Sequence, residues 1–216
     1  IETVSKVYAE VNRELGEEWY DTEELNIPLG VPTPYKIVKW VGTGKYSDVF
    51  IAYKGTRDNL VAVKVLKPVR RQKYIREIKI LYNLREGPNI LRLQEVVENP
   101  ETSQLSLITE YVNECYYQDL FENITPEETR CYLYQLLRAL DYAHSHGIMH
   151  RDVKPLNILF DRTTKNLRLI DWGLGEFYFP GQKYNIHVAS LHFKPIELLL
   201  DYQLYDYSID MWSFGV

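Results

Sequence analysis

The sequence predicts an α+β fold, in which an antiparallel sheet carrying one helix is followed by a mainly helical region. The first observation is a series of short segments, rich in β-branched and aromatic residues and separated by turns, which is typical of strands. These segments are Tyr35–Val41, Asp48–Tyr53, Leu60–Leu66, Ile90–Val97 and Leu105–Glu110. The second observation is the helical spacing of apolar residues, first over Arg71–Leu84 and then in the second half of the chain.

The second half begins with a clear helix start. Thr125 is suited to cap the helix, Pro126 suits its first position, and Glu128 closes a capping box. The apolar stripe of this helix consists of Leu133, Leu136, Leu137 and Leu140. Gly147 ends the helix, and short strands are predicted at Asn157–Phe160 and Leu167–Ile170.

The first 34 residues are polar and mixed, and they precede the first predicted strand. Apolar side chains at helical spacing predict a short helix over Val4–Leu15. Residues 26–34 are rich in proline, which ends regular structure. We therefore expect residues 1–34 to form a segment that packs on the rest of the chain.

The composition is that of a globular protein. Of the 216 residues, 45% are hydrophobic and 25% are charged, which excludes disordered and fibrous proteins. The net charge of −5 argues against an architectural nucleic-acid binder, and we expect no direct nucleic-acid binding. Cys115 and Cys131 are too few for a disulfide framework, which favours a reducing compartment. No apolar run reaches membrane-spanning length, and the acidic start is unlike a signal peptide, so we expect no membrane association.

Three features of the first half are weak signals when taken singly. Gly42 and Gly44 lie in a turn between strands, where glycine lets backbone N–H groups approach phosphate oxygens, although most such turns are plain hairpins. Lys64 ends an apolar strand and, by itself, is interpreted as a surface lysine whose ammonium reaches water. Glu77, by itself, is interpreted as a solvated glutamate of the predicted helix.

A polar cluster over residues 150–157 is a stronger signal, because it lies between an apolar helix and an apolar strand, where core residues are expected. Asp171-Trp-Gly173 follows the next strand and supplies a second carboxylate. Asp152, Asn157 and Asp171 offer oxygen ligands suited to Mg²⁺, which keeps waters and substrate phosphates in its shell. The order and spacing of these motifs together are highly specific.

Over residues 35–216 the chain resembles the eukaryotic protein kinases. The glycine turn, the strand lysine, the helix glutamate, the His-Arg-Asp loop, Asp-x-Gly and Asp210-x-Trp-Ser occur in the family's order. Within that family it resembles the casein kinase II catalytic (alpha) subunit, notably because Trp172 stands where most kinases have phenylalanine. The resemblance implies a bilobal protein kinase fold, with an N-lobe over residues 35–112 and a mainly helical C-lobe over residues 113–216, incomplete at its C-terminus.

The resemblance further implies a serine/threonine kinase that uses ATP and Mg²⁺. Asp152 would accept the proton of the substrate hydroxyl and Lys154 would stabilise the γ-phosphate. Lys64, oriented by Glu77, would hold the other phosphates. Asn157 and Asp171 would be the metal ligands. The ATP-binding residues would be Val41, Gly42, Gly44, Val49, Ala62, Lys64, Glu110, Val112, Leu159 and Ile170.

Protein substrates with acidic serine or threonine sites are also implied by the resemblance. We interpret a basic stretch at the start of the predicted Arg71–Leu84 helix, together with part of the segment after Asp171, as the surface that binds them. The residues are Arg70, Arg71, Lys73, Arg76, Ser190 and Lys194. A solvated helix face is the alternative for the basic stretch. Two of the family's arginines are replaced by His187 and Leu191, so we expect weaker or altered acidic selectivity.

The segment after Asp171 also bears on regulation. Residues 171–197 contain no threonine, and in the resembled family this activation segment is held open by the N-terminal segment without phosphorylation. We therefore expect constitutive activity. The residues expected to make this contact are Glu10, Glu17, Glu18, Trp19 and Tyr20. A solvated, loosely held N-terminus is the alternative.

Other functions remain open. Because the chain ends at Val216, before the last helices of a kinase C-lobe, it is expected to be a fragment or a catalytically impaired binding module or decoy for the regulatory beta subunit of casein kinase II. The surface for that subunit would lie around Ile37, Phe50, Val63 and Ile108. A proline-directed or cyclin-dependent kinase is disfavoured by Trp172 and Lys194, and a NAD-binding enzyme by the lack of a βαβ unit. The resemblance implies a location in nucleus and cytoplasm.

Overall fold

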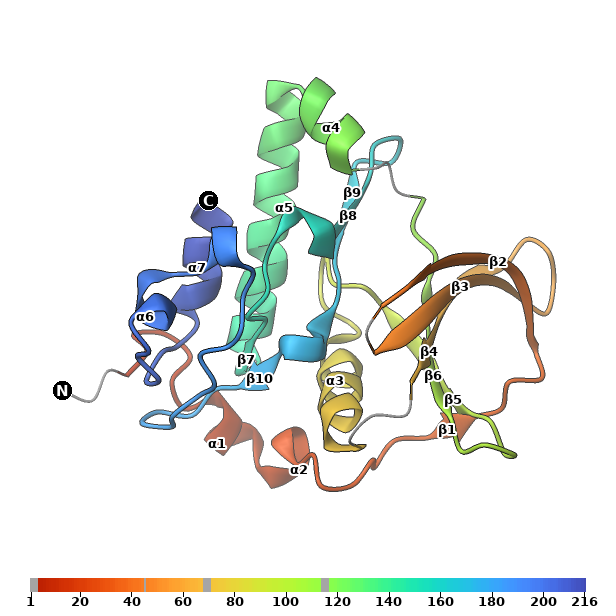
Figure 1. The fold of residues 1–216 in the computed structure, drawn as a ribbon, viewed down its shortest axis with the longest axis horizontal. Helices are drawn as coiled ribbons and strands as arrows, with labels where there is room; N and C mark the ends of the chain where they lie inside the picture. The colour runs from red at the N-terminus through yellow and green to blue at the C-terminus, as the bar shows by residue number, and fades with distance from the viewer. Residues whose placement is uncertain (1–3, 45, 68–70, 114–116) are drawn as a thin grey trace. The chain divides into compact units, whose positions relative to one another are not determined.

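The chain forms two compact units, which are described separately. This computed structural model describes residues 4–44, 46–67, 71–113 and 117–216, without the side chains of residues 71–73 and 117–119. The sheet unit comprises Thr22–Arg85 and Leu91–Val112, and the helical unit comprises Ile1–Asp21, Glu86–Ile90 and Asn113–Val216. Figure 1 shows the elements of both units. The N-terminal segment is thus divided, because residues 22–34 belong to the sheet unit.

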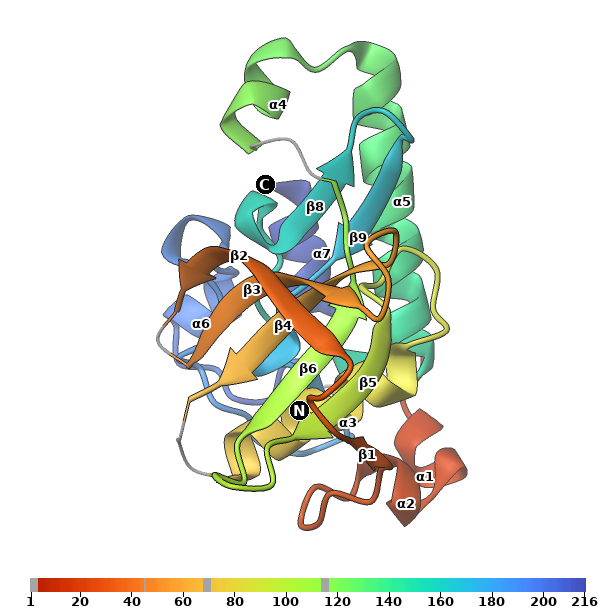
Figure 2. The same cartoon turned by 90° about the vertical axis from the view of Figure 1, so that its right-hand side faces the viewer.

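The sheet unit is built on a six-stranded sheet with the strand order β1-β5-β6-β4-β3-β2, seen in Figure 2. Its strands are β1 (Leu29–Gly30), β2 (Tyr35–Thr43), β3 (Ser47–Lys54), β4 (Leu60–Leu66), β5 (Leu93–Glu98) and β6 (Leu105–Glu110). Neighbouring strands are antiparallel except β1 and β5, which are parallel. Strand β1 was not predicted, because two residues between prolines carry no periodic pattern.

The helix of the sheet unit, α3 (Arg71–Leu84), has the predicted bounds. Its apolar residues at helical spacing are buried, which confirms the predicted pattern: Ile75, Ile78, Leu81 and Leu84. The bounds of β4 and β6 also agree with the prediction, whereas β2, β3 and β5 differ at their ends. The periodic spacing of apolar residues along the sequence therefore predicted most strands and the helix of this unit.

The strand register separates the side chains of the sheet into two faces. On one face lies a buried apolar cluster of Ala52, Val61, Val63, Val97 and Ile108. On the opposite face, Val49 pairs with Lys64 across β3 and β4. Thr109 pairs with Ala62, which shares the face of Lys64 because it is two residues away in β4. The face opposite the apolar cluster thus carries Val49, Ala62 and Lys64 together.

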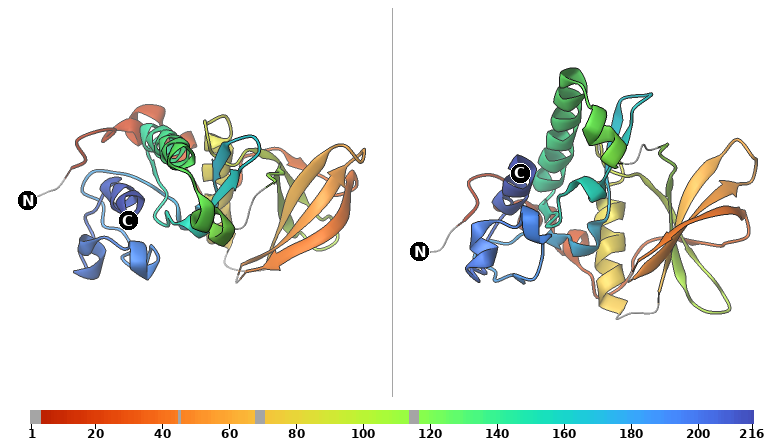
Figure 3. Two further views of the ribbon diagram at one scale, coloured as in Figure 1. Left: turned by 90° about the horizontal axis from the view of Figure 1, so that it is seen from above. Right: turned by 45° about the horizontal axis from the view of Figure 1, so that its top comes forward.

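The helical unit is organised around the long helix α5 (Pro126–Ser145), which the left view of Figure 3 shows nearly end-on. The other helices described in this unit are α1 (Val11–Leu15), α2 (Glu17–Tyr20), α4 (Tyr117–Asn123), α6 (Ile196–Leu199) and α7 (Ser208–Gly215). Short 3-10 helices are η1 (Pro155–Asn157), η2 (Trp172–Leu174) and η3 (Leu191–Phe193). Two small antiparallel sheets pair β7 (Ile148–Met149) with β10 (Glu176–Phe177), and β8 (Ile158–Asp161) with β9 (Asn166–Leu169). In the described part of the chain, no helix is both long and apolar enough to span a bilayer.

The start of α5 confirms the predicted capping box. Thr125 Oγ1 accepts a hydrogen bond from the backbone N–H of Glu128 at 3.2 Å. The Glu128 carboxylate in turn accepts one from the Thr125 N–H at 3.0 Å. These two bonds satisfy N–H groups that a helix end otherwise leaves without partners.

The predicted apolar stripe of α5 is wrong in part. Leu133 and Leu137 are 39% and 38% exposed, whereas Leu136 is buried as predicted. The buried face also includes Ala139 and Ala143. These two residues were not part of the predicted stripe, which consisted of leucines alone. Small side chains allow a neighbouring segment to approach the helix closely, so they mark the packed face here as well as leucine does.

The N-terminal residues pack on the helical unit. The predicted helix over Val4–Leu15 is wrong, because α1 begins only at Val11 and Tyr8 has a φ of 55°, which a right-handed helix cannot accommodate. The Ser5 N–H donates to the Tyr178 hydroxyl at 2.9 Å. The Trp19 indole N–H donates to the carbonyl of His146 at 3.1 Å.

Among the residues expected to contact the activation segment, Tyr20 does so, whereas Trp19 contacts His146 at the end of α5. Tyr20 packs edge-on against Phe179 in the activation segment, with ring centroids 4.9 Å apart. The expectation for the acidic residues is wrong: Glu17 and Glu18 are exposed, and Glu10 pairs with Arg13 at 2.7 Å. Aromatic packing and hydrogen bonds, rather than these acidic side chains, therefore hold the segment in place.

A buried asparagine fixes the N-terminal segment to the end of α5. The Asn12 side-chain amide donates to the carbonyl oxygens of Gly147 and Tyr178, at 2.8 and 2.9 Å. Gly147 has a φ of 74°, and a Cβ atom at this position would overlap the Asn12 side chain. Glycine is thus required here both by its backbone conformation and by the close approach of Asn12.

We expect Gly147→Ala to lower the free energy of unfolding by about 3 kcal/mol. About 1 kcal/mol comes from the left-handed backbone and about 2 kcal/mol from the two displaced hydrogen bonds of Asn12. Gly181→Ala is a matched control, because Gly181 has a φ of 75° but open space around its Cβ position. Urea denaturation of both variants checks this, and equal losses of stability would show that the Asn12 contact contributes nothing.

Candidate active site

Lys64 in the sheet unit forms a partly buried ion pair. Its ammonium lies 2.5 Å from Glu77 Oε1, and the two side chains are 24% and 9% exposed. The interpretation of each residue by itself, as a surface lysine and a solvated glutamate, is therefore wrong, whereas the contact between them agrees with the pairing that the resemblance implies. The central position of β4 places Lys64 on the sheet, and the helical register of α3 places Glu77 opposite it. The pair presents a positioned ammonium group on the face of the sheet that also carries Val49 and Ala62.

The glycine turn lies between β2 and β3. Gly42 pairs with Val49, and the Gly44 N–H donates to the carbonyl of Ser47 at 2.7 Å. The Lys67 ammonium donates to the Gly44 carbonyl at 2.9 Å. Because Lys67 directly follows β4, this bond fixes the turn to the end of that strand. Val41, next to Gly42, is half exposed. The backbone N–H and carbonyl of Gly44 are thus both bonded within the chain, and phosphate binding by this turn stays a prediction.

The end of β6 carries the remaining residues predicted to bind ATP in the sheet unit. Glu110 exchanges backbone and side-chain hydrogen bonds with Arg92: its N–H donates to the Arg92 carbonyl at 3.1 Å, and its carboxylate accepts the Arg92 N–H at 2.9 Å. Val112 is partly buried two residues later. These bonds fix the direction in which the chain leaves the sheet.

In the helical unit, three predicted site residues converge on the carboxylate of a fourth, Asp152. Asp152 Oδ2 lies 2.7 Å from the Lys154 ammonium and accepts a hydrogen bond from the Asn157 amide at 2.9 Å. Asp152 Oδ1 accepts a hydrogen bond from the Ser190 hydroxyl at 3.0 Å. Lys154 also donates to Ser190 at 2.8 Å, so the network is closed. Ser190 is 38 residues from Asp152 in the chain and reaches it only through the fold.

The side chain of Asn157 is oriented in a way that suits a cation. Its amide nitrogen donates both to the Asp152 backbone carbonyl at 2.8 Å and to the Asp152 carboxylate. Because the nitrogen is fixed by these two bonds, the amide oxygen is the group that Asn157 presents to a ligand. A single amide oxygen beside carboxylates fits Mg²⁺, which takes few protein ligands and keeps its waters. Among the described residues there is no cluster of three or more His, Cys, Asp or Glu side chains that could hold a metal ion.

Asp171 stands at the other predicted metal position, directly before η2. It has a φ of 59°, in the left-handed region, and its side chain is exposed. Trp172 beside it is completely buried and contacts His150 edge-on, with ring centroids 4.6 Å apart. The tryptophan thus anchors the backbone from which Asp171 projects. The nearby Leu159 and Ile170, predicted to contact adenine, are both partly exposed.

The backbone before Asp152 is held by Asp210 of α7. The buried Asp210 carboxylate accepts the N–H groups of His150 and Arg151, both at 2.8 Å, and lies 2.9 Å from His144 Nε2. Burial acts to raise the pKa of Asp210, but the hydrogen bond from His144 and the N–H of His150 outweigh it, and the pKa is lowered. The side chain of His150 is fixed as well, between the Asp152 N–H and the carbonyl of Ile170. In the sequence, Asp210 was identified only as part of the Asp210-x-Trp-Ser motif. No pattern of neighbouring residues indicates that its carboxylate accepts backbone hydrogen bonds.

Arg151 is satisfied by groups of the chain itself. Its guanidinium donates to the carbonyl of Leu174 at 2.7 Å and to the hydroxyl of Tyr205 at 2.9 Å. Glu176 lies 3.6 Å from the same guanidinium. A buried arginine needs such partners because an unpaired buried charge is costly. The activation segment that follows Asp171 is therefore tied to the catalytic loop.

Of the residues predicted to bind acidic substrates, Ser190 belongs to the Asp152 network. The Lys194 ammonium donates to the carbonyl of Ile186 at 3.3 Å. Arg76 is partly buried. Arg70 lies outside the described residues, as do the side chains of Arg71 and Lys73.

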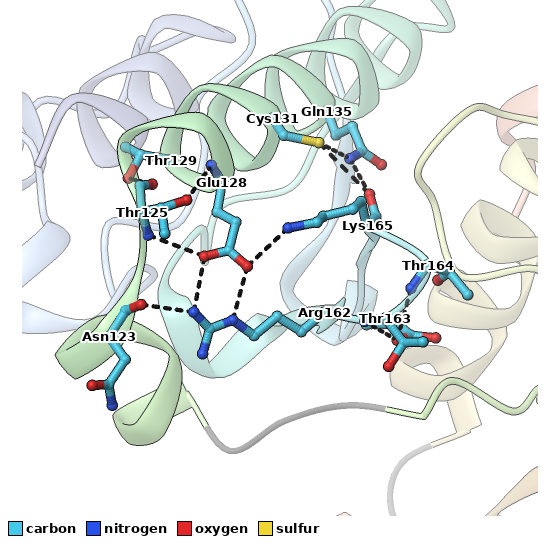
Figure 4. Close-up of polar contacts among 11 residues, drawn as sticks. Asn123, Thr125, Glu128, Thr129, Cys131, Gln135, Arg162, Thr163, Thr164 and Lys165 are labelled. Atoms are coloured by element: carbon cyan, nitrogen blue, oxygen red, sulfur yellow. Dashed lines mark hydrogen bonds and ion pairs between the residues drawn. The ribbon is translucent and has the colours of Figure 1, made fainter.

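A polar network that the sequence analysis missed fixes the β8–β9 hairpin to α5 (Figure 4). The buried carboxylate of Glu128 contacts Arg162 with both oxygens, at 2.8 and 2.9 Å, and Lys165 at 3.0 Å. Arg162 also donates to the carbonyl of Asn123 at 2.7 Å. Glu128 therefore caps α5 and anchors the hairpin at once. The network holds the end of β8 opposite to the one that follows Asn157, a predicted metal ligand.

We expect Glu128→Gln to lower the melting temperature at neutral pH by several degrees. Hydrogen bonds from Arg162, the Thr125 N–H and Lys165 hold the pKa of Glu128 well below its usual range. The ionised group therefore stabilises the fold above about pH 4.3, the unfolded value, and this contribution is lost as the pH falls toward the folded-state pKa. The difference between wild type and variant should accordingly shrink on acidification.

Glu127→Gln is the matched control for this prediction. Glu127 lies in the same turn but is exposed, and within the described residues its ion pair is with the exposed Arg130, at 2.9 Å. Such surface pairs contribute little to stability. A Glu128→Gln variant that melts like the Glu127→Gln control at pH 7 would contradict the anchoring role.

A family model for the protein kinase domain matches residues 35–216. The sheet unit agrees with a kinase N-lobe, since a mixed α/β arrangement with a six-stranded sheet carries the Lys64–Glu77 pair. The helical unit agrees with part of a kinase C-lobe. Its His-Arg-Asp loop, residues 150–157, brings together Asp152, Lys154 and Asn157. By this match and this arrangement, the chain belongs to the protein kinase family, whose members phosphorylate proteins.

Proposed function

We propose that this chain is a serine/threonine kinase of the casein kinase II type, which transfers the γ-phosphate of ATP to protein hydroxyl groups. The observation that carries the proposal is the closed network of Asp152, Lys154 and Ser190. In it, Asp152 already accepts a hydroxyl hydrogen bond, the interaction that a substrate serine or threonine requires. Lys154 two residues after Asp152 is the pattern of serine/threonine kinases.

The roles of the site residues follow from their chemistry. The substrate oxygen forms a bond to the γ-phosphorus, the bond to the β,γ-bridging oxygen breaks, ADP leaves, and Asp152 takes the hydroxyl proton. The Lys154 ammonium offsets negative charge beside the reacting oxygen. In the sheet unit, Lys64 holds phosphate oxygens and Glu77 keeps its ammonium in position. Asn157 and Asp171 would hold Mg²⁺, which neutralises charge on the transferring phosphoryl group when bound.

The casein kinase II assignment is supported by Trp172. Its indole is completely buried beside His150, where most kinases have a phenylalanine. We propose that this larger ring holds Asp171 in a single conformation. Binding energy then need not be used to order the metal ligand before transfer.

Constitutive activity is part of the proposal. Glu176, Leu174 and Tyr205 already satisfy Arg151, so no added phosphate group is needed to neutralise it. The N-terminal segment packs on Tyr178 and Phe179 of the activation segment. Both contacts favour an ordered segment without modification.

A second candidate function is that of a binding module for the regulatory beta subunit, and exposed apolar residues on the edge strand β2 favour it. Ile37 is half exposed, and Trp40 lies on the same face because a register shift brings it opposite Phe50. Val63 and Ile108, expected on this surface, are instead buried in the apolar cluster of the sheet. The candidate surface is therefore restricted to the margin of the sheet.

The kinase proposal predicts Mg²⁺-dependent transfer of phosphate from ATP to a serine peptide by chain pretreated with phosphatase. Asp152→Asn should reduce the rate by about 10²- to 10⁴-fold, because the base that accepts the proton is lost. Asp201→Asn, at an exposed position, is the control and should keep full activity. A folded, monodisperse chain that transfers no phosphate would contradict the kinase proposal and favour the binding module. Activity lost only after phosphatase treatment would contradict constitutive activity alone.

A further inference from the structure

The glycine turn is bonded to Lys67, the residue that directly follows β4. The Lys67 ammonium donates to the carbonyl of Gly44 at 2.9 Å and to the hydroxyl of Thr43 at 2.7 Å. It also lies 3.1 Å from the Asp48 carboxylate. The backbone N–H of Lys67 donates to the carbonyl of Tyr46 at 2.9 Å. One residue from outside the β2–β3 hairpin thus contacts both of its strands and the turn between them.

These side-chain contacts lie on one face of the sheet. Thr43 pairs with Asp48 across the hairpin, and Asp48 pairs with Val65 of β4, which packs on the apolar cluster. Lys64 directly precedes Val65, and neighbouring side chains of a strand point to opposite faces. The Lys67 ammonium therefore holds Asp48 from the face opposite the Lys64 ammonium. From there it restrains the turn without occupying the face on which Lys64 is expected to meet phosphate.

The side chains of this group form a closed polar network. The Thr43 hydroxyl donates to the Asp48 carboxylate while it accepts from the Lys67 ammonium. Hydrogen bonds from Thr43 and Lys67 lower the pKa of Asp48, so the carboxylate is ionised at neutral pH. A single ion pair between exposed side chains contributes little. Here, however, one ammonium has three acceptors on the same hairpin, so it restrains several of its residues at once.

We propose that Lys67 is a positioning residue for the nucleotide, which holds the glycine turn in the conformation that receives the ATP phosphates. The inference rests on the proposed kinase function and adds a residue to its nucleotide site. Glycine gives the turn conformational freedom, and a ligand that orders a loop loses affinity to that ordering. Lys67 orders the turn in advance and so removes part of this cost. It acts through Thr43, Gly44 and Asp48.

Nucleotide binding to a Lys67→Met variant tests this without requiring phosphate transfer. Isothermal titration calorimetry would compare ATP, in the presence of Mg²⁺, with adenosine, which has the same base and sugar but no phosphate. We expect the variant to bind ATP about 3- to 10-fold more weakly than wild type, the size of one or two surface polar contacts. Adenosine affinity should be unchanged. Lys67→Arg should restore ATP affinity to within about 2-fold, because a guanidinium also donates several hydrogen bonds.

Lys54→Met is the matched control. The Lys54 side chain is 35% exposed, against 34% for Lys67, but it lies at the other end of the β2–β3 hairpin and pairs with Glu95 at 3.6 Å. It should leave the ratio of ATP to adenosine affinity unchanged.

Two results would overturn the role of Lys67 alone. One is a Lys67→Met variant that binds ATP like wild type. The other is an equal loss of ATP and adenosine affinity in that variant, because a general loss of structure would then explain it. A folded wild-type chain that does not bind ATP would contradict the proposed kinase function, and this inference with it.

Discussion

The buried carboxylate of Asp210 is the interaction on which the candidate active site depends. It accepts the N–H groups of His150 and Arg151 and contacts His144, so one side chain of α7 joins the end of α5 to the catalytic loop. Arg151 has a φ of 67°, an unfavourable backbone conformation that persists only where its surroundings fix it. A buried donor without a partner costs about 1–3 kcal/mol, and here one carboxylate satisfies two adjacent donors. The position of Asp152, one residue later, follows from this arrangement.

Helix α5 connects the Asp210 contacts with the β8–β9 hairpin. His144, near its C-terminal end, contacts Asp210, and Glu128, in its first turn, holds Arg162 of the β8–β9 hairpin. Asn157 lies in the chain between these two anchored regions. A rigid helix with a polar anchor at each end can therefore keep Asp152 and Asn157 in a fixed relation, as their hydrogen bonds require. Such positioning is the main contribution that a protein makes to phosphoryl transfer.

The sequence predicts this fold where the physical cause is local. The capping box at Thr125 and the bounds of α3 and β4 follow from residues within a few positions of one another. The contacts made by Glu128 with Arg162 and by Asn12 with Gly147 join residues 34 and 135 positions apart, and no local pattern indicates them. The motif at residues 150–157 indicated chemistry because polar residues stand where core is expected. Which oxygen each side chain presents depends on tertiary hydrogen bonds, and the structure was needed to see it.

The most direct test of this account is the unfolding of an Asp210→Asn variant together with hydrogen exchange at His150 and Arg151. The account predicts that stability at pH 7 falls by about 3 kcal/mol and that both amides lose protection, because asparagine lacks one acceptor oxygen and the charge. Since the pKa of Asp210 is lowered in the fold, the difference from wild type should be full above about pH 4 and shrink as the pH falls further. A variant with wild-type stability and protected amides would show that the catalytic loop does not depend on this carboxylate.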